Sequence, residues 1–305
     1  MPVFNGSNFI RDAIDSIIGQ TFTDFELIVC DNASEDDTCD IVQQYAAKDS
    51  RIELIRNPRN IGASANYNLG FRHGRGKYLK WCAHDDTLSP NYLEACIRVM
   101  DANPDVALAF GSTLGITGKN EIVRPVGDET PSLESDNPAE RFQRAIELSG
   151  TCFPIFGVFR RENLERSTLH RPYYGSDRAV LAEAAIMGKF RRVEEAIFYN
   201  REHEQRSINI DDKVQRSFWQ TGRKSRGAAA EHLQLARHLF EIASRHSDIT
   251  SPWPLRAALI RRSLLPIQLG RYGLELVHMV SPAAAQAAKR VFAKPQRNHE
   301  ASKMV

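Results

Sequence analysis

The sequence predicts an α/β fold, in which a mostly parallel sheet flanked by helices is followed by a C-terminal extension made of helices. Over the first 210 residues, short apolar runs typical of buried strands alternate with segments whose apolar residues recur at helical spacing. Repeated strand–helix units of this kind build a parallel sheet that is covered on both faces. Beyond residue 210 only the helical spacing persists. We therefore expect two regions, residues 1–210 and residues 211–305.

The first helix is predicted over residues 10–18, where Ile10 and Ile14 lie on one face. Ser7 or Asn8 could cap it, because both side chains can accept hydrogen bonds from the first turn. The later elements alternate along the chain, with strands expected near residues 25–30, 52–55, 78–82, 106–110, 155–159 and 190–199, and helices near residues 41–45, 64–73, 92–100, 141–148 and 177–187.

Two stretches depart from this alternation. Residues 111–140 are polar and rich in Gly, Pro, Thr and Asp, which indicates a loop or an irregular insertion. In the C-terminal extension we expect one amphipathic helix from about residue 212 to residue 245 and another after Pro254.

Composition indicates a globular protein of a reducing compartment. With 42% hydrophobic and 26% charged residues, 305 residues can bury a sizeable core. The five cysteines are scattered and include no Cys-x-x-Cys pair, so neither a disulfide framework nor a zinc site is indicated. The sequence contains no run of about 18 apolar residues and no basic segment leading into an apolar one at its start. We expect a cytoplasmic protein.

Charge is distributed unevenly along the chain. Residues 211–305 carry 16 Lys and Arg against 7 Asp and Glu, whereas residues 1–210 carry 24 against 31. A basic tail indicates an anionic partner, such as the inner face of a membrane on which a basic amphipathic helix can lie. The alternative, which we favour, is that the C-terminal helices pack across the body of the protein or between two copies of it.

An acidic pair, Asp85 and Asp86, directly follows the mostly apolar run 78–82. Carboxylates at the carboxyl end of a strand can hold a divalent cation and the phosphates that it neutralises. The alternative is structural, because Asp and Thr87 also close strands and cap helices.

Four blocks, taken in order and spacing, resemble family-2 glycosyltransferases of the GT-A fold. They are residues 1–6 (MPVFNG), 20–34 (QTFTDFELIVCDNAS), 57–66 (NPRNIGASAN) and 84–86 (HDD). The resemblance covers about residues 1–205. It implies an inverting transferase that moves a sugar from a nucleotide diphosphate-sugar to an acceptor hydroxyl.

The resemblance also implies roles for individual residues at the donor site. The segment that begins at Pro2 lines the nucleotide pocket, Asp85 holds the ribose or supports the metal, and Asp86 binds Mn²⁺ or Mg²⁺. Asp31 accepts from the base or its ribose, and its alternative is a turn or helix cap with Asn32 and Ser34. The substrate-binding set implied in this way is Pro2, Phe4, Asn5, Asp31, Asn60, Asp85 and Arg206, and His203 is a further candidate metal ligand.

Asp177 lies where the resemblance places the general base, which takes the proton of the acceptor hydroxyl. The alternative is that Ser176 or Asp177 caps the following helix. Glu183, farther along that helix, is the second candidate for the base.

Three departures from the family pattern bear on the prediction. Ala83 stands where the family frequently has the first Asp of Asp-x-Asp-Asp, and the chain starts at Met1 where the family has several β-branched residues before the position of Pro2. We expect a misassigned start or a truncation. The Gln-x-x-Arg-Trp motif of processive relatives is absent, which favours a single transfer per encounter.

We therefore expect a nucleotide diphosphate-sugar donor, a glycan or lipid-linked acceptor of cell-surface glycan synthesis and no nucleic-acid partner. Homo-oligomerisation and peripheral contact with an anionic membrane remain open. Two other functions are weighed against this one. A non-catalytic homologue would bind the nucleotide-sugar alone, and a nucleotidyltransferase would be expected to carry a Gly-rich triphosphate loop, which is not seen.

Overall fold

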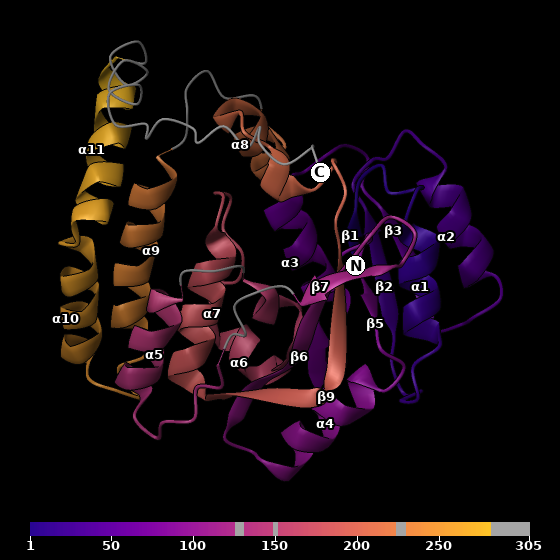
Figure 1. Cartoon of the computed structure of the whole chain (residues 1–305), viewed down its shortest axis with the longest axis horizontal. Helices are drawn as coiled ribbons and strands as arrows, with labels where there is room; N and C mark the ends of the chain where they lie inside the picture. Colours follow the sequence, from indigo (N-terminus) through magenta and orange to yellow (C-terminus); the bar gives the residue numbers. More distant parts are fainter. Residues whose placement is uncertain (126–130, 149–151, 224–229, 282–305) are drawn as a thin grey trace, which may run out of the picture.

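The computed structural model describes residues 1–125, 131–148, 152–223 and 230–281. Its first sheet is parallel, in the order β1 (Pro2–Val3), β2 (Leu27–Asp31) and β3 (Ile52–Arg56). Helices α1 (Ile10–Ile18) and α2 (Thr38–Ala46) follow β1 and β2, as the alternation of the sequence predicts. These elements form one end of the molecule (Figure 1).

Helix α1 buries the face predicted from the spacing of Ile10 and Ile14. Its capping prediction is wrong, because Phe9 occupies the N-cap position and its side chain makes no cap hydrogen bond. Ser7 instead donates its backbone N–H to Asp36 Oδ2 over 3.0 Å, which ties the start of α1 to the loop before α2.

The second sheet has six strands and is mixed. Its order is β4-β8-β6-β9-β5, with β7 paired to β6. Within it only β6 and β9 run parallel, and the other neighbouring pairs are antiparallel. The prediction of a mostly parallel sheet therefore holds for the first sheet and is wrong for the second. Strands buried on both faces read as continuous apolar runs in either direction, so the sequence pattern does not reveal their polarity. The strand bounds are β4 (Tyr78–Lys80), β5 (Thr87–Leu88), β6 (Val106–Ile116), β7 (Ile122–Pro125), β8 (Val158–Arg160) and β9 (Lys189–Arg201).

Much of the segment 111–140 that was predicted as a loop forms strands or helix where it is described. Strand β6 continues to Ile116 and turns back through β7. Gly111 suits this strand because a Cβ at that position would lie 2.3 Å from the carbonyl oxygen of Ala196 on β9. The glycine that suggested a loop therefore permits close strand pairing. Residues 126–130 lie outside the described part.

Helices α4 (Tyr92–Ala102), α6 (Arg161–Arg166) and α7 (Ser176–Met187) pack against the second sheet, whereas α3 (Ala63–His73) packs against β1 and β2 of the first sheet and α5 (Pro138–Glu147) packs against α7. Short 3₁₀ turns lie at Phe153–Phe156 and Ser207–Asn209. The extended segment predicted near residues 155–159 is therefore half turn and half strand. Helix α7 is buried along almost its whole length.

The C-terminal helices are α8 (Lys213–Thr221), α9 (Glu231–Arg245), α10 (Pro252–Ser263) and α11 (Pro266–Val280). The single helix predicted over residues 212–245 is wrong, because α8 ends at Thr221 with Gly222 in the left-handed conformation, φ 66°. Residues 224–229 and 282–305, part of the predicted extension, lie outside the described residues.

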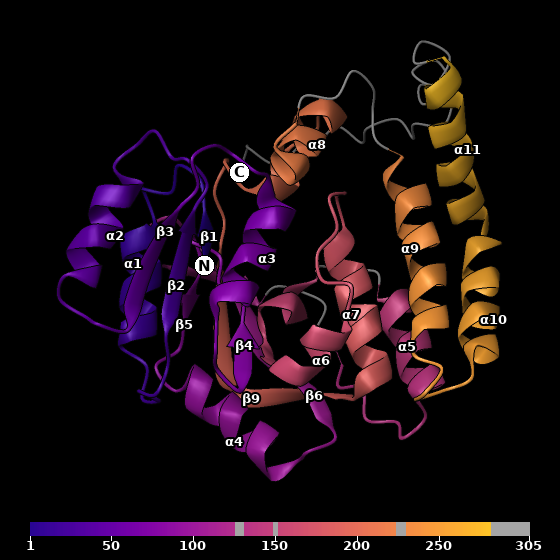
Figure 2. The same ribbon diagram turned by 180° about the vertical axis from the view of Figure 1, so that it is seen from behind.

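Helices α9 and α10 pack against the rest of the protein, as we favoured. Leu239 and Ile242 of α9 and Leu255 of α10 belong to the same buried cluster as Phe142 of α5 and Val180 of α7. Figures 1 and 2 show α9, α10 and α11 standing at the end of the molecule opposite the first sheet. Across the residues described, none of the helices combines the length and the apolar character that a membrane span requires.

Candidate active site

The acidic pair lies in the loop between β4 and β5. The Oδ1 atom of Asp86 accepts two hydrogen bonds from β9, one from Asn200 Nδ2 over 3.0 Å and one from the backbone N–H of Arg201 over 2.8 Å. Asp86 is buried, and burial together with the charge of Asp85 raises its pKa well above the usual value. Such a carboxylate has too little positive charge around it, a deficit that a cation would offset.

Asp85 is bound by His203. The Oδ2 atom of Asp85 lies 2.9 Å from His203 Nε2. Burial opposes ionisation of Asp85, but the hydrogen bond from His203 and the neighbouring histidine charges outweigh it and lower its pKa. The other ring nitrogen of His203, Nδ1, is buried and has no hydrogen-bond partner among the described residues. The structure thus places His203 beside the acidic pair, with one nitrogen facing Asp85.

Arg201 fixes the position of this loop through hydrogen bonds. Its side chain is fully buried and donates to Asp85 O over 2.7 Å, to Asp12 Oδ2 over 3.0 Å and to the carbonyl oxygens of Thr117 and Gly118. The guanidinium therefore joins α1, the acidic loop and the β6–β7 hairpin. All of these partners belong to the protein, so the buried Arg201 has a structural role.

Arg206 reaches the acidic pair through Asn200. Its Nη2 atom donates to Asn200 Oδ1 over 2.7 Å, and the amide of Asn200 in turn donates to Asp86. Arg206 is one of the charges that act on the pKa of Asp86, and it acts to lower it. Unlike Arg201, Arg206 is only partly buried.

The donor set fits Mn²⁺ or Mg²⁺ when the substrate supplies further ligands. Within the described residues no group of three or more His, Cys, Asp and Glu side chains forms a ready-made cation site. Such ions are commonly held by one or two carboxylates together with substrate phosphates. Asp86 and Asp85 supply those carboxylates, and the raised pKa of Asp86 marks the local excess of negative charge.

The predicted nucleotide residues gather at one end of the first sheet. Asn5, at φ 51°, accepts from the backbone N–H of Glu35 over 2.9 Å, and Phe4 is 41% exposed. Pro2 pairs with Cys30 of β2. The loop after Asn5 reaches the acidic motif, because a Cβ on Gly6 would lie 2.4 Å from the ring of His84.

Asp31 and Asn60 are held by their own loops. Asp31 is fully buried, and its oxygens accept the backbone N–H of Ser34 over 3.2 and 3.3 Å, the turn considered as the alternative for this residue. Asn60 Oδ1 accepts from Asn32 Nδ2 over 2.9 Å and from the N–H of Gly62 over 2.8 Å. Both residues therefore shape the loops at this end of the sheet.

Asp177 is the second residue of helix α7. Burial raises its pKa, and the neighbouring Arg178 partly opposes that effect. Its Oδ1 atom accepts the N–H of Arg178 over 3.0 Å, whereas Gly175 is the N-cap residue and no side-chain cap bond forms. The capping alternative for Ser176 and Asp177 is therefore wrong. A carboxylate with a raised pKa is a better proton acceptor.

Glu183, the second candidate for the base, is fully buried. It accepts hydrogen bonds from the N–H and hydroxyl of Thr168 and from His246 Nε2 over 2.8 Å. Because these partners occupy the carboxylate, Glu183 has a structural role.

Tyr67 is a site residue that the sequence reasoning missed. Burial raises the pKa of its phenol, and the charges of Asp85, Asp86, Cys82 and Asp177 raise it further. The phenol therefore lies within the field of both the acidic pair and the candidate base. Its position next to Asn66, at the end of the block 57–66, was the available signal.

Comparison with known proteins matches this arrangement to one family. The family model for glycosyl transferase family 2 matches residues 1–167. An uncharacterized glycosyltransferase of Rickettsia prowazekii is 31% identical over 157 residues, which are 51% of this chain and 44% of the relative. The GalNAc(5)-diNAcBac-PP-undecaprenol beta-1,3-glucosyltransferase of Campylobacter jejuni is 29% identical over 178 residues, 58% of this chain and 55% of that protein. The match spans about half the length of these curated relatives.

Solved structures share the fold. S. aureus TarS 1–349 aligns with a TM-score of 0.60 at 14% identity, covering 94% of this chain and 81% of the other. The mannosyltransferase PcManGT from Pyrobaculum calidifontis aligns with a TM-score of 0.51 at 17% identity, covering 96% and 74%. At such identities the likeness shows the fold alone. Since the family model covers more than half of the chain, and the fold agrees with it, the chain belongs to glycosyl transferase family 2.

Proposed function

We propose that this chain is an inverting, non-processive glycosyltransferase that moves a sugar from a nucleotide diphosphate-sugar to an acceptor hydroxyl, with Mn²⁺ or Mg²⁺ as cofactor. The observation that carries the proposal is the acidic pair, in which Asn200 and the backbone N–H of Arg201 orient Asp86 and His203 Nε2 lies 2.9 Å from Asp85 Oδ2. Sugar transfer requires that the negative charge of the leaving nucleotide diphosphate be offset on one side of the sugar. It also requires that the proton of the acceptor hydroxyl be accepted on the other side. An acidic pair and a separate carboxyl meet these two needs.

The acidic pair would serve the donor. Asp86, oriented by Asn200 and Arg201, would hold the cation together with the donor phosphates, and Arg206 would add positive charge beside them. A divalent cation bound there supplies charge that offsets the departing nucleotide diphosphate. Similar folds were solved with UDP-GlcNAc in TarS and with GDP-Man and Mn²⁺ in PcManGT, which supports this donor class.

Asp177 would serve the acceptor. Its carboxylate would take the proton of the acceptor hydroxyl while that oxygen attacks the anomeric carbon opposite the leaving nucleotide. Attack from that face inverts the anomeric configuration. Its raised pKa, caused first by burial, strengthens it as a base.

The acceptor would be a glycan or lipid-linked intermediate of cell-surface glycan synthesis, used in the cytoplasm and in peripheral contact with the membrane. The Campylobacter relative supports this choice, because its name describes a glycan carried on a polyprenyl diphosphate. The two regions 1–210 and 211–305 would then work as one unit, since α9 and α10 share a core with α5 and α7.

A non-catalytic nucleotide-sugar-binding protein is the second candidate. Ala83 replaces a frequent carboxylate of the family motif, and the described residues hold no three-residue cation cluster. Binding of a nucleotide-sugar without its hydrolysis or transfer would favour this candidate over the enzyme.

The test is a screen of nucleotide-sugars for binding and hydrolysis with Mn²⁺, Mg²⁺ or excess chelator. We expect Asp86→Ala to abolish hydrolysis and metal-dependent binding of the nucleoside diphosphate while the melting temperature stays near that of the parent. Asp40→Ala, an exposed acid on α2, is the matched control and should keep full activity. Full activity of the parent in excess chelator would remove the metal from the mechanism.

A further inference from the structure

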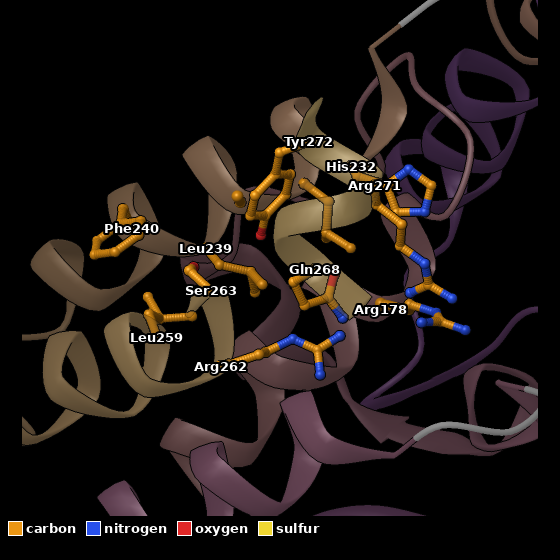
Figure 3. Close-up of a pocket in the computed structure, with 12 residues that line it drawn as sticks. Arg178, His232, Leu239, Phe240, Leu259, Arg262, Ser263, Gln268, Arg271 and Tyr272 are labelled. Atoms are coloured by element: carbon orange, nitrogen blue, oxygen red, sulfur yellow. The ribbon is translucent and has the colours of Figure 1, made fainter. Parts of the chain in front are cut away.

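A pocket opens among α7, α9, α10 and α11, away from the acidic pair. Its polar lining includes Arg178 from α7, Arg262 and Ser263 from α10, and Gln268 and Arg271 from α11. Figure 3 shows the side chains of Arg178, Arg262 and Arg271 among the residues that line this pocket. The space between its atoms is about 390 Å³, a volume that includes open solvent.

Within the described part of the chain, no salt bridge joins Arg178, Arg262 or Arg271 to an acid. Acidic groups do act on two of them at longer range, because the charges of Arg178 and Asp177 interact and Glu147 acts on Arg262. Burial, together with the charges of Arg178 and Arg271, lowers the pKa of Arg262, while Tyr272 and Glu147 act in the opposite direction.

The fourth basic residue of the lining is already paired. His232 Nδ1 lies 2.8 Å from Glu275 Oε1, so its ring is engaged with a buried carboxylate. Cations brought together with little compensation destabilise a fold, because each loses water without gaining an opposite charge. An anion bound among the three arginines would restore the balance.

We propose that this pocket binds a phosphate group of the acceptor. The proposal rests on the proposed transfer function. Arg178 directly follows Asp177, whose pKa its charge lowers, so one helix start connects the candidate base to the pocket. A phosphate held there would lie on the acceptor side of the site. Several arginines can share the oxygens of one phosphate, to which guanidinium groups donate paired hydrogen bonds.

The phosphate can belong to a lipid-linked acceptor or to a soluble phosphate-bearing glycan. Residues next to the pocket lining favour the lipid. Leu264, just after α10 and beside Ser263, is 63% exposed, and Ile267, in the first turn of α11 beside Gln268, is 61% exposed. An apolar chain attached to the phosphate could cover these side chains.

The first experiment measures binding of inorganic pyrophosphate by calorimetry in excess chelator. The chelator removes the divalent cation, so the metal-dependent donor site does not contribute to the binding. We expect Arg262→Gln with Arg271→Gln to weaken binding by about tenfold or more, since two charge-assisted contacts are lost. Arg237→Gln, an exposed arginine on α9, is the matched control and should bind like the parent. Equal binding by the double variant and the parent would overturn the proposal.

These variants distinguish a failure of the proposed transfer function from a failure of the proposed phosphate site. The Asp86→Ala variant should keep pyrophosphate binding in chelator although its donor site is lost. The double arginine variant should keep the parent rate of nucleotide-sugar hydrolysis by water. Loss of hydrolysis in both the parent and the double variant would count against the transfer function and leave the phosphate site standing.

The second experiment identifies the source of the phosphate by sedimentation with vesicles. The vesicles contain phosphatidylcholine alone, with 20% phosphatidylglycerol, or with a polyprenyl diphosphate. We expect the polyprenyl diphosphate to recruit the parent and the Arg237→Gln control but not the double variant. Recruitment by phosphatidylglycerol to the same extent would overturn the acceptor assignment in favour of a membrane head group. Pyrophosphate binding without recruitment to any vesicle would support a soluble phosphate-bearing acceptor.

Discussion

At the scale of single residues, the candidate site depends on which carboxylates remain available to bind a cation or to accept a proton. Asp31 and Glu183 are fully buried and bound by the protein, whereas Asp86 and Asp177 carry pKa values raised by burial. A raised pKa indicates that the protein supplies too little compensating charge. A cation would supply that charge at Asp86, and a proton would supply it at Asp177.

Asp177→Asn is the sharpest single-residue test of the base. Because the amide keeps the shape of the carboxylate but cannot accept the proton, we expect kcat to fall by about 10²-fold or more with little change in donor affinity. The measurement is steady-state kinetics together with donor binding by calorimetry. A variant that loses donor binding instead would assign Asp177 to the nucleotide site, and a kcat within a few-fold of the parent would exclude it as the base.

At the scale of elements, α8 closes over the start of α3 and α7. Gln220 of α8 donates to Ser64 Oγ at the start of α3 and to Ser176 Oγ over 3.4 Å at the start of α7. The turn after α8 packs against the loop that carries Asn60, where a Cβ on Gly222 would lie 2.7 Å from the carbonyl oxygen of Asn60. The first helix of the C-terminal region therefore supports a loop of the predicted nucleotide site.

Gly222→Ala tests this contact. The added Cβ would meet backbone atoms, and φ 66° already disfavours a side chain, so we expect the substitution to destabilise the protein by roughly 1–3 kcal/mol. Gly273→Ala is the control, since a Cβ there meets nothing within 4 Å and alanine favours the helix α11. The melting temperature is measured for both variants. A Gly222→Ala variant with the melting temperature of the parent would show that α8 does not hold the Asn60 loop.

At the scale of the whole molecule, one buried histidine links α9 to the body and a second lies within the body. His238 of α9 lies 2.7 Å from Tyr173 OH and 2.8 Å from Thr168 Oγ1. His170 packs between Trp81 and Tyr67, and its Nε2 has no partner among the described residues. Burial lowers the pKa of both histidines to about 4.

These pKa values predict a fold that weakens in mild acid. Between pH 6.5 and pH 4 these histidines bind protons in the unfolded chain but stay neutral in the folded protein. Their contribution to the free energy of unfolding is therefore fully present above pH 6.5 and falls as the pH approaches 4. Each histidine contributes up to about 3 kcal/mol to this change. Urea unfolding at pH 7.5 and pH 5 measures it.

His170→Phe should reduce this pH dependence, because phenylalanine fills the same aromatic contact without a titrating group. His73→Gln, an exposed histidine at the end of α3, should leave it unchanged. If His170→Phe unfolds with the same pH dependence as the parent, the cause lies in other groups.

The sequence by itself determined the family and most of the elements. Four motif blocks lie in short loops and strand ends whose chemistry is local, and the apolar spacing of α1 predicts its buried face because helical periodicity is a property of nearby residues. The acidic pair was identified in the same way, from its place after a strand.

Only the tertiary structure decided strand polarity, which carboxylates remain usable, and where the arginines gather. Arg178, Arg262 and Arg271 come from three helices, and the parallel β6 and β9 are separated by more than seventy residues of chain. Arg201 shows the same limit, because it is buried and held by hydrogen bonds to Asp12 and to the backbone of Asp85, both of which are distant from it in sequence. Pairing, burial and desolvation depend on neighbours that are distant in sequence, so no local pattern contains them.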